Sequence, residues 1–248
     1  MPERKSTSTS DEPRTIGILG GMSGKSTVEY YRRIDDAVNE RYGGHHAGNI
    51  LIRSVNFADI EGFIADEQWG EAGSYLADAA QNLEAGGADF VIMATNTMHK
   101  VAPDITDALS VPFVHIVDAT ADAILDAGID TVGVLGTSVT MEDEFYRERF
   151  AQHGIDIVVP DEDDREDVDR IVFEELTKGE IRDESRDRYL DVVDDLVGQG
   201  AEGVVLGCTE IEQLIDQADR PEVPFFDTTA LHVERAVEES LGVSVEAK

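Results

Sequence analysis

The sequence has a single cysteine among its 248 residues. One cysteine excludes an internal disulfide framework and a cysteine-rich zinc site. No apolar run approaches the roughly 18 to 20 residues that cross a bilayer, and segment 1–14 lacks the apolar core of a signal peptide. We therefore expect a cytoplasmic protein with no membrane partner. Segment 1–14 is rich in serine, threonine and charge, which predicts a disordered leader.

Basic residues are few as well. The chain carries 53 acidic residues against 20 basic ones, of which five are lysine, and its formal net charge is −33. A surface this negative repels phosphate and offers no basic stripe, which argues against nucleic acid as a partner. We interpret the excess as halophile-like, because salt at high concentration screens the self-repulsion of such a charge. An ordinary acidic protein is the alternative.

Hydrophobic residues still make up 41%, enough for a large buried core. From Thr15 onward short apolar runs alternate with longer segments that repeat apolar residues at helical spacing. This alternation predicts an α/β protein with mostly parallel sheets flanked by helices. The expected strands are Thr15–Leu19, Ile50–Val55, Phe90–Ala94, Phe113–Ile116, Thr131–Leu135, Ile155–Val159, Gly203–Leu206 and Pro224–Phe226. The expected helices are Ser26–Tyr42, Trp69–Ala85, Ala119–Ala127, Met141–His153, Asp167–Lys178, Arg182–Gln199 and Leu231–Leu241.

The chain also repeats itself at an offset of about 112 to 116 residues. The matching pairs are Thr15–Gly20 with Thr131–Gly136, Gly87–Thr95 with Gly200–Cys208, and Val111–Val114 with Val223–Phe226. We expect two similar pseudo-symmetric lobes, lobe 1 over 15–115 and lobe 2 over 116–224, with part of 225–248 returning to lobe 1. Ligands of such sheets bind beyond the carboxyl ends of the strands. The repeat therefore predicts a site in the cleft between the lobes, with Thr95 and Cys208 on opposite sides.

The segment Gly20–Thr27 follows an expected strand and opens an expected helix, as a phosphate-binding loop does. Its spacing does not fit, because Leu19 stands where the P-loop motif requires glycine, and the dinucleotide pattern fails at the same residue. The free backbone N–H groups of such a turn still suit a carboxylate. Gly136–Thr140 is the equivalent polar turn of the second repeat.

Cys208 is the candidate catalytic residue of the second repeat. A lone cysteine beside an apolar strand is usually a small core residue. Here Thr209 and Glu210 follow it, and the N–H groups of a helix start are expected to lower the pKa of its thiol. In the first repeat Thr95 is followed by Asn96 and Thr97, whose side chains could hold a carboxylate or enolate.

Other candidates favour structural roles. His99 is more simply explained as a satisfied or exposed histidine than as a tuning group. His45 and His46 lack further ligands at metal spacing, and the acidic run Asp161–Glu166 is more typical of a solvated helix entry than of a cation site. We predict no metal site.

These motifs together resemble the aspartate/glutamate racemase superfamily, whose members racemise acidic amino acids without a cofactor. The likeness extends from Ile16 to Leu241. It rests on Gly17–Met22, Asn96–His99, Leu135–Thr137, Phe173–Leu176 and Leu206–Glu210. It implies a small-molecule amino-acid substrate, no cofactor and a homodimer.

The resemblance also implies roles for individual residues. Typical members have a cysteine before the Asn-Thr pair, where this chain has Thr95, as in a subgroup of broad-specificity amino-acid racemases. The residues expected to contact the substrate are Met22, Ser23, Asn96, Thr97, Thr137, Thr209 and Glu210, with Lys178 as a carboxylate partner by spacing. No residue matches the carboxylate-binding arginine of aspartate racemases, although Arg53 lies near its position.

Racemisation requires one group that removes the α-proton from one face and another that supplies a proton to the opposite face. A thiolate is an effective base, whereas a threonine hydroxyl is far less acidic. Cys208 is therefore the expected main base and Thr95 the donor or relay, which predicts faster turnover from one enantiomer. Two other functions remain open: a single-cysteine decarboxylase of substituted malonates, and a binder of small carboxylates without catalysis.

Overall fold

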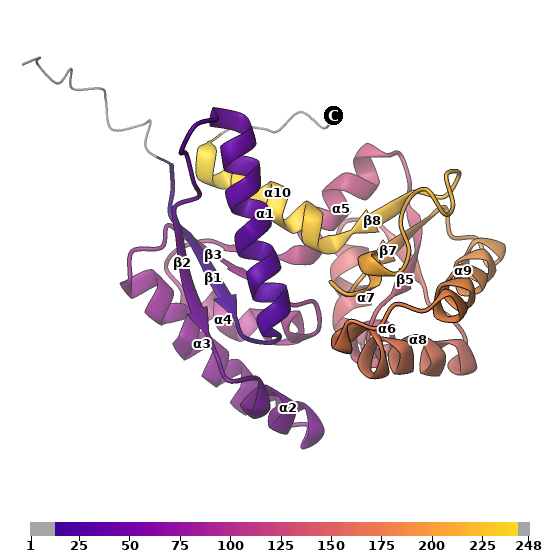
Figure 1. Ribbon diagram of the computed structural model, residues 1–248. Helices are drawn as coiled ribbons and strands as arrows, with labels where there is room; N and C mark the ends of the chain where they lie inside the picture. Colours follow the sequence, from indigo (N-terminus) through magenta and orange to yellow (C-terminus); the bar gives the residue numbers. More distant parts are fainter. Residues whose placement is uncertain (1–12, 243–248) are drawn as a thin grey trace, which may run out of the picture.

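The computed structural model describes residues 13–242, which form two four-stranded parallel sheets flanked by helices (Figure 1). The first sheet has the order β2-β1-β3-β4 and the second the order β6-β5-β7-β8. The strands are β1 (Ile16–Gly20), β2 (Ile50–Ser54), β3 (Phe90–Met93), β4 (Phe113–Val114), β5 (Thr131–Leu135), β6 (Asp156–Val158), β7 (Gly203–Leu206) and β8 (Phe225–Asp227). Because the two orders are the same, the sheets confirm the predicted two-lobed α/β architecture.

Helices cover both sheets. In the first half they are α1 (Gly24–Tyr42), α2 (Phe57–Ala65), α3 (Trp69–Ala85), η1 (Thr97–Val101), α4 (Ala102–Ala108) and α5 (Ile116–Asp126). In the second half they are α6 (Ser138–Glu142), α7 (Glu144–Gln152), α8 (Glu162–Glu174), η2 (Leu176–Lys178), α9 (Asp183–Gly198), η3 (Ile211–Gln213) and α10 (Thr228–Leu241). The central strands β1, β3 and β7 are buried along their whole length, which explains their continuous apolar sequences.

Several expected helix boundaries were wrong, and capping side chains explain most of the differences. The helix expected over Met141–His153 is two helices, because Asp143 has an extended backbone and its carboxylate accepts the Phe145 N–H. Asp161 caps α8 in the same way, so that helix begins earlier than expected and ends at Glu174, before η2. Helix α5 begins at Ile116 because the His115 ring accepts the Val117 N–H. Helices α2 and α4 were not predicted.

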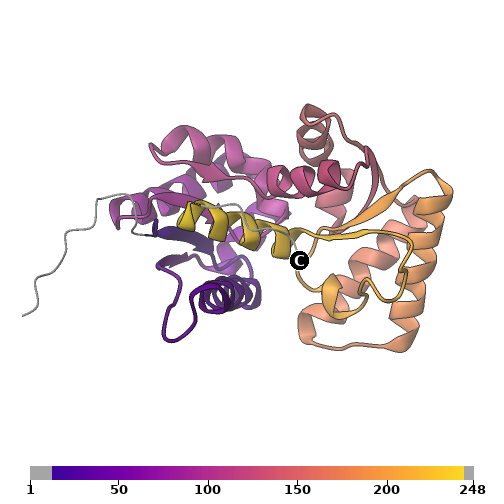
Figure 2. The same cartoon turned by 90° about the horizontal axis from the view of Figure 1, so that it is seen from above.

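The end of the chain joins the two lobes. Strand β8 pairs with β7 in the second sheet, and α10 then packs against both α1 and α5. Figures 1 and 2 show α10 running from the second sheet back along the first lobe. Its buried residues Val233, Ala236 and Val237 share one core cluster with β1 and β3.

Most of the segment predicted to be a disordered leader, residues 1–12, lies outside the described residues. Arg14, by contrast, has a fixed place. Its backbone N–H donates to the Ser240 carbonyl at 2.7 Å, its guanidinium pairs with Glu239, and it lies over the Phe90 ring. The prediction of disorder was therefore wrong for Arg14. Between residues 13 and 242, no helix is long and apolar enough to cross a bilayer.

Candidate active site

A cavity of about 820 Å³ lies between the lobes, at the carboxyl ends of the central strands. Thr95 follows β3 and Cys208 follows β7, the equivalent strands of the two sheets, and both residues line this cavity. Both are half-buried. The internal repeat thus brings a hydroxyl and a thiol to the wall of one cavity, from separate lobes.

The turn between β1 and α1 forms another part of the wall, with Met22 and Ser23. Gly21 makes the turn possible, because its φ is +92° and a Cβ atom there would lie 2.2 Å from the Val55 carbonyl oxygen. Ser23 then caps α1, since its Oγ accepts the Ser26 N–H at 3.1 Å. The first residues of α1, Gly24 and Lys25, also line the cavity, and the free N–H groups of a helix start suit an anion.

Glu210 is the hydrogen-bond partner of the Cys208 thiol. The Cys208 thiol donates to one Glu210 carboxylate oxygen at 3.0 Å, and the Thr209 hydroxyl donates to the same oxygen at 2.6 Å. Burial, together with this carboxylate, raises the pKa of the Cys208 thiol well above its ordinary value. The expectation of a lowered pKa was wrong, because the element that follows is the three-residue η3 and not an α-helix with a strong dipole.

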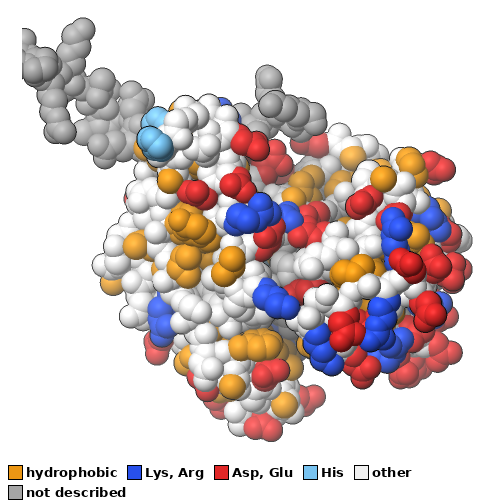
Figure 3. Space-filling model, in the orientation of Figure 1, with side chains coloured by type: hydrophobic (Ala, Val, Ile, Leu, Met, Phe, Trp, Pro, Cys, Tyr) orange, Lys and Arg blue, Asp and Glu red, His pale blue; other side chains and the backbone are white. Residues whose placement is uncertain are grey.

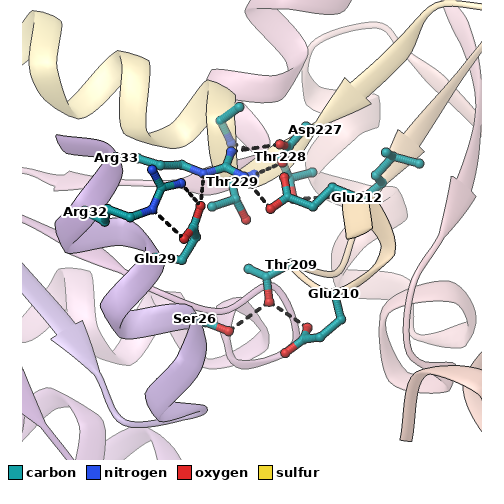
Figure 4. A network of polar contacts seen from close by, with 12 residues as sticks. Ser26, Glu29, Arg32, Arg33, Thr209, Glu210, Glu212, Asp227, Thr228 and Thr229 are labelled. Atoms are coloured by element: carbon teal, nitrogen blue, oxygen red, sulfur yellow. Dashed lines mark hydrogen bonds and ion pairs between the residues drawn. The ribbon is translucent and has the colours of Figure 1, made fainter. Parts of the chain in front are cut away.

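A row of hydroxyl groups connects Glu210 to the start of α1 across the lobe boundary (Figure 4). Thr209 Oγ1 lies 2.8 Å from Ser26 Oγ, which lies 3.0 Å from Ser23 Oγ. Because Thr209 donates to the carboxylate, Ser26 must donate to Thr209, and Ser23 to Ser26. The row therefore has one direction, toward Glu210.

Asn96 is buried, and its amide joins the lobes. Its Oδ1 accepts the Tyr146 hydroxyl at 3.1 Å, and its Nδ2 donates to Thr228 Oγ1 at 3.0 Å. These two bonds leave one amide N–H for a ligand. Thr97 and Thr137 also line the cavity, with their hydroxyl oxygens 3.1 Å apart. The two threonines come from opposite lobes, so this contact, too, crosses the cleft.

His99 is buried and satisfied, and it holds the backbone beside Thr95. Its Nε2 accepts the Ile116 N–H at 3.3 Å, so Nδ1 carries the proton and donates to the Thr95 carbonyl at 2.7 Å. Burial and the neighbouring His115 and His232 lower the pKa of His99 well below its ordinary value, and the ring stays neutral.

The structure brings together nine of the ten site residues named from the sequence, and Lys178 is the exception. Thr95, Cys208 and seven of the proposed contacts line the cavity: Met22, Ser23, Asn96, Thr97, Thr137, Thr209 and Glu210. Lys178 ends η2 with an exposed side chain and is outside the lining, so the geometry does not support the carboxylate-binding role inferred from its spacing.

Lys25 lines the cavity instead. It stands at the start of α1, and its ammonium donates to the Thr177 carbonyl of the other lobe at 2.5 Å. Arg53 bonds the neighbouring Ser54 carbonyl and is not part of the lining. In the sequence, Lys25 belongs to the segment Gly20–Thr27, which fails the P-loop pattern. Its place in an expected strand-to-helix turn could have indicated a cation near the ligand site.

Sequence reasoning also missed the apolar wall. One helix from each lobe, α2 and α8, contributes hydrophobic side chains to the lining: Phe57, Ile60, Ile64 and Ala65 from α2, and Val172 and Phe173 from α8. The spacing of Phe57, Ile60 and Ile64 is helical and could have revealed α2.

An ion-pair cluster joins the lobes beside this site (Figure 4). Arg33 of α1 pairs with Glu29 in its own helix and with Glu212 and Asp227 of the second lobe. Burial and the adjacent Asp227 raise the pKa of Glu212 to about 8. The two carboxylates compete for the same guanidinium, and the Arg33 ion pairs offset part of their mutual repulsion.

Known proteins match most of this chain. Residues 19–236 match the Asp/Glu/hydantoin racemase family. The broad specificity amino-acid racemase RacX of Bacillus subtilis (strain 168) is 26% identical over 217 residues, which are 87% of this chain and 93% of RacX.

Two solved structures are similar at the level of both sequence and fold. A candidate Asp/Glu racemase from Yersinia pestis has a TM-score of 0.88 and 46% identity, with 92% of this chain and 99% of that one covered. PH1733, an aspartate racemase homologue from Pyrococcus horikoshii OT3, has a TM-score of 0.82 and 34% identity at the same coverage.

Proposed function

This chain belongs to the Asp/Glu/hydantoin racemase family, and on that premise we propose that Cys208 and Thr95 racemise a free amino acid without a cofactor. The chain is an amino-acid racemase, an isomerase. The observation that carries the proposal is the position of these two residues, which follow equivalent strands of two lobes and line one cavity.

Glu210 makes the first step possible. The resting thiol already donates to the Glu210 carboxylate, so transfer of that proton gives a thiolate beside a carboxylic acid. The thiolate removes the α-proton of the substrate from one face, and the electron pair of the C–H bond remains on the substrate as a carbanion or enolate. N–H and hydroxyl donors of Asn96 and Thr97 support the substrate α-carboxylate as charge develops, together with Lys25 and the free N–H groups at the start of α1.

Thr95 acts on the opposite face. Its hydroxyl supplies a proton to the α-carbon, and the alkoxide left behind regains a proton through water. The Glu210 carboxylic acid gives its proton back to that water, which completes the inversion and restores the starting state. A threonine hydroxyl is a much weaker acid than a thiol, so the two directions use unequal catalysts. We expect a higher initial rate of racemisation from the enantiomer whose α-proton faces Cys208.

Proton NMR in heavy water tests this function. The wild-type protein should replace the α-proton of at least one amino acid with deuterium and form the other enantiomer. Cys208→Ala should stop both processes while the fold remains intact by circular dichroism. Unchanged exchange in Cys208→Ala would contradict the proposed base.

The same samples separate the two other functions. Carbon dioxide release from a substituted malonate, without exchange on any amino acid, would identify a decarboxylase. Undiminished carboxylate affinity in Cys208→Ala, with no turnover in the wild type, would identify a binder. The cytoplasmic location, the homodimer and the high-salt interpretation stay predictions from the sequence.

A further inference from the structure

The charges that face the cavity do not match an acidic amino acid. Among the described residues of the lining, the ionisable side chains other than Cys208 are one ammonium group and three carboxylates: Lys25, Glu61, Asp169 and Glu210. Within residues 13–242, no arginine lines the cavity. Aspartate or glutamate adds two carboxylates and one ammonium group, so its net charge has the same sign as the wall.

The α-carboxylate that every amino acid carries already uses the available positive groups. The Lys25 ammonium and the free N–H groups of the first turn of α1 lie in the same wall. A side-chain carboxylate would then be enclosed without a cation, which is strongly unfavourable. Arg33 cannot take that role, because its guanidinium is bound to Glu29, Glu212 and Asp227 outside the lining.

The remaining walls are hydrophobic and come from both lobes. Helix α2 supplies Phe57, Ile60 and Ile64, and α8 supplies Val172 and Phe173. Phe57 is 38% exposed and Phe173 is 50% exposed, which is unusual for phenylalanine unless the surface meets an apolar partner. An aliphatic side chain between the two helices would remove this apolar surface from water.

We propose that the substrate is an amino acid with an uncharged aliphatic side chain of leucine or methionine size, held between α2 and α8, and that aspartate and glutamate are poor substrates. This inference rests on the proposed racemase function. It replaces the acidic substrate class expected from the sequence, because that expectation needed a second cationic group and Lys178 does not reach the cavity.

The test compares kcat/KM for leucine, methionine, alanine, lysine, aspartate and glutamate in one buffer at one salt concentration. Leucine and methionine should exceed aspartate and glutamate by about 100-fold, since an unpaired buried carboxylate is discriminated at least as strongly as a lost methylene. Aspartate, glutamate or lysine as the best substrate would overturn the inference and leave the racemase function standing. Absence of α-proton exchange with every amino acid would overturn the function itself.

A matched pair of variants tests the hydrophobic wall. Phe173 and Ile181 are both 50% exposed in the second lobe, but only Phe173 lines the cavity. Phe173→Ser should lower kcat/KM for leucine roughly tenfold and leave that for alanine nearly unchanged, because a methyl group buries far less apolar surface than a leucine side chain. Ile181→Ser should alter neither. An equal loss for leucine and alanine in Phe173→Ser would show that α8 does not select the side chain.

Discussion

The acid–base state of Cys208 depends on the carboxylate two residues further along the chain. Both the thiol and the Thr209 hydroxyl donate to one oxygen of Glu210. The raised pKa of the thiol means that the thiolate forms at neutral pH only when this carboxylate takes the proton. Glu210 is therefore expected to act as the base for Cys208, a role that the sequence did not distinguish from substrate contact.

Replacing Glu210 by glutamine should test this role. Glu210→Gln should lower kcat at neutral pH by about 100-fold or more, because a glutamine side chain cannot take the proton of the thiol. The deficit should shrink as the pH rises and Cys208 ionises without help. Glu212→Gln is the matched control, because the Glu212 carboxylate pairs with Arg33 and the Cys208 thiol with Glu210. An equal deficit at every pH would indicate a purely structural effect.

The sequence predicted where the two candidate catalytic residues lie, but not the acidity of Cys208 or the cation that lines the cavity. The motifs located Thr95 and Cys208 because both follow a buried strand of a detectable repeat. The acidity of Cys208 was not predictable, since it depends on burial and on how the Glu210 side chain turns back. Lys178 was named by spacing alone, whereas Lys25 is the lysine that lines the cavity among residues 13–242.

A buried histidine fixes helix α10 against the first lobe. His232 donates from Nε2 to the Val114 carbonyl at 2.9 Å, and its Nδ1 accepts the Tyr30 hydroxyl at 2.9 Å. Burial lowers the pKa of His232 to about 4. In the unfolded chain its pKa is about 6.5, so the unfolded state binds the proton first as the pH falls.

The free energy of unfolding should therefore decrease as the pH falls from about 6.5 toward 4, by up to about 3 kcal/mol from His232. His115, whose pKa burial lowers to about 3, adds to the same trend. Urea unfolding of wild-type protein and His232→Gln at pH 7 and pH 4.5 measures the effect, and the variant should lose part of the pH dependence. His45→Gln, at an exposed position, should retain it. Parallel curves for wild type and His232→Gln would contradict the account.

Element boundaries were predictable where apolar periodicity was strong and not where single capping residues decided them. The strands Thr131–Leu135 and Gly203–Leu206 agree with β5 and β7 residue by residue. Asp143 and Asp161 changed the helix starts because short polar side chains accept backbone N–H groups. Helix α2 was missed because it is short, yet it carries much of the apolar wall.

The whole molecule carries its charge on both lobes. Figure 3 shows acidic side chains over each of them on the face drawn there, interspersed with basic ones. Although ion pairs such as those of Arg33 offset part of the repulsion, the formal net charge of −33 remains. Repulsion of this kind acts over about 10 Å at 0.1 M salt and about 3 Å at 1 M.

Thermal stability should consequently rise with salt. Between 0.1 M and 2 M potassium chloride we expect the melting temperature to increase by roughly 5 to 10 °C, which corresponds to a few kcal/mol for a chain of this size. Sucrose at equal osmolality is the control and should give a smaller increase, since it does not screen charge. Equal melting temperatures at both salt concentrations would refute the halophile-like interpretation.

The internal repeat predicted the large-scale arrangement, because equal strand order follows from equal sequence order. What it could not predict is the set of contacts that join the lobes, such as Ser26 to Thr209 and Asn96 to Tyr146. These contacts pair residues of unlike sequence context, so no repeat or motif records them.

The central claim is that Thr95 and Cys208 serve opposite faces of one α-carbon, and Thr95→Ala tests it most directly. Each pure enantiomer of the best substrate is incubated with this variant in heavy water, and α-proton loss and inversion are measured separately. We predict that one enantiomer exchanges its α-proton with retention at Cys208, while the other becomes inert and inversion falls sharply. Inversion of both enantiomers at wild-type rates would contradict the account.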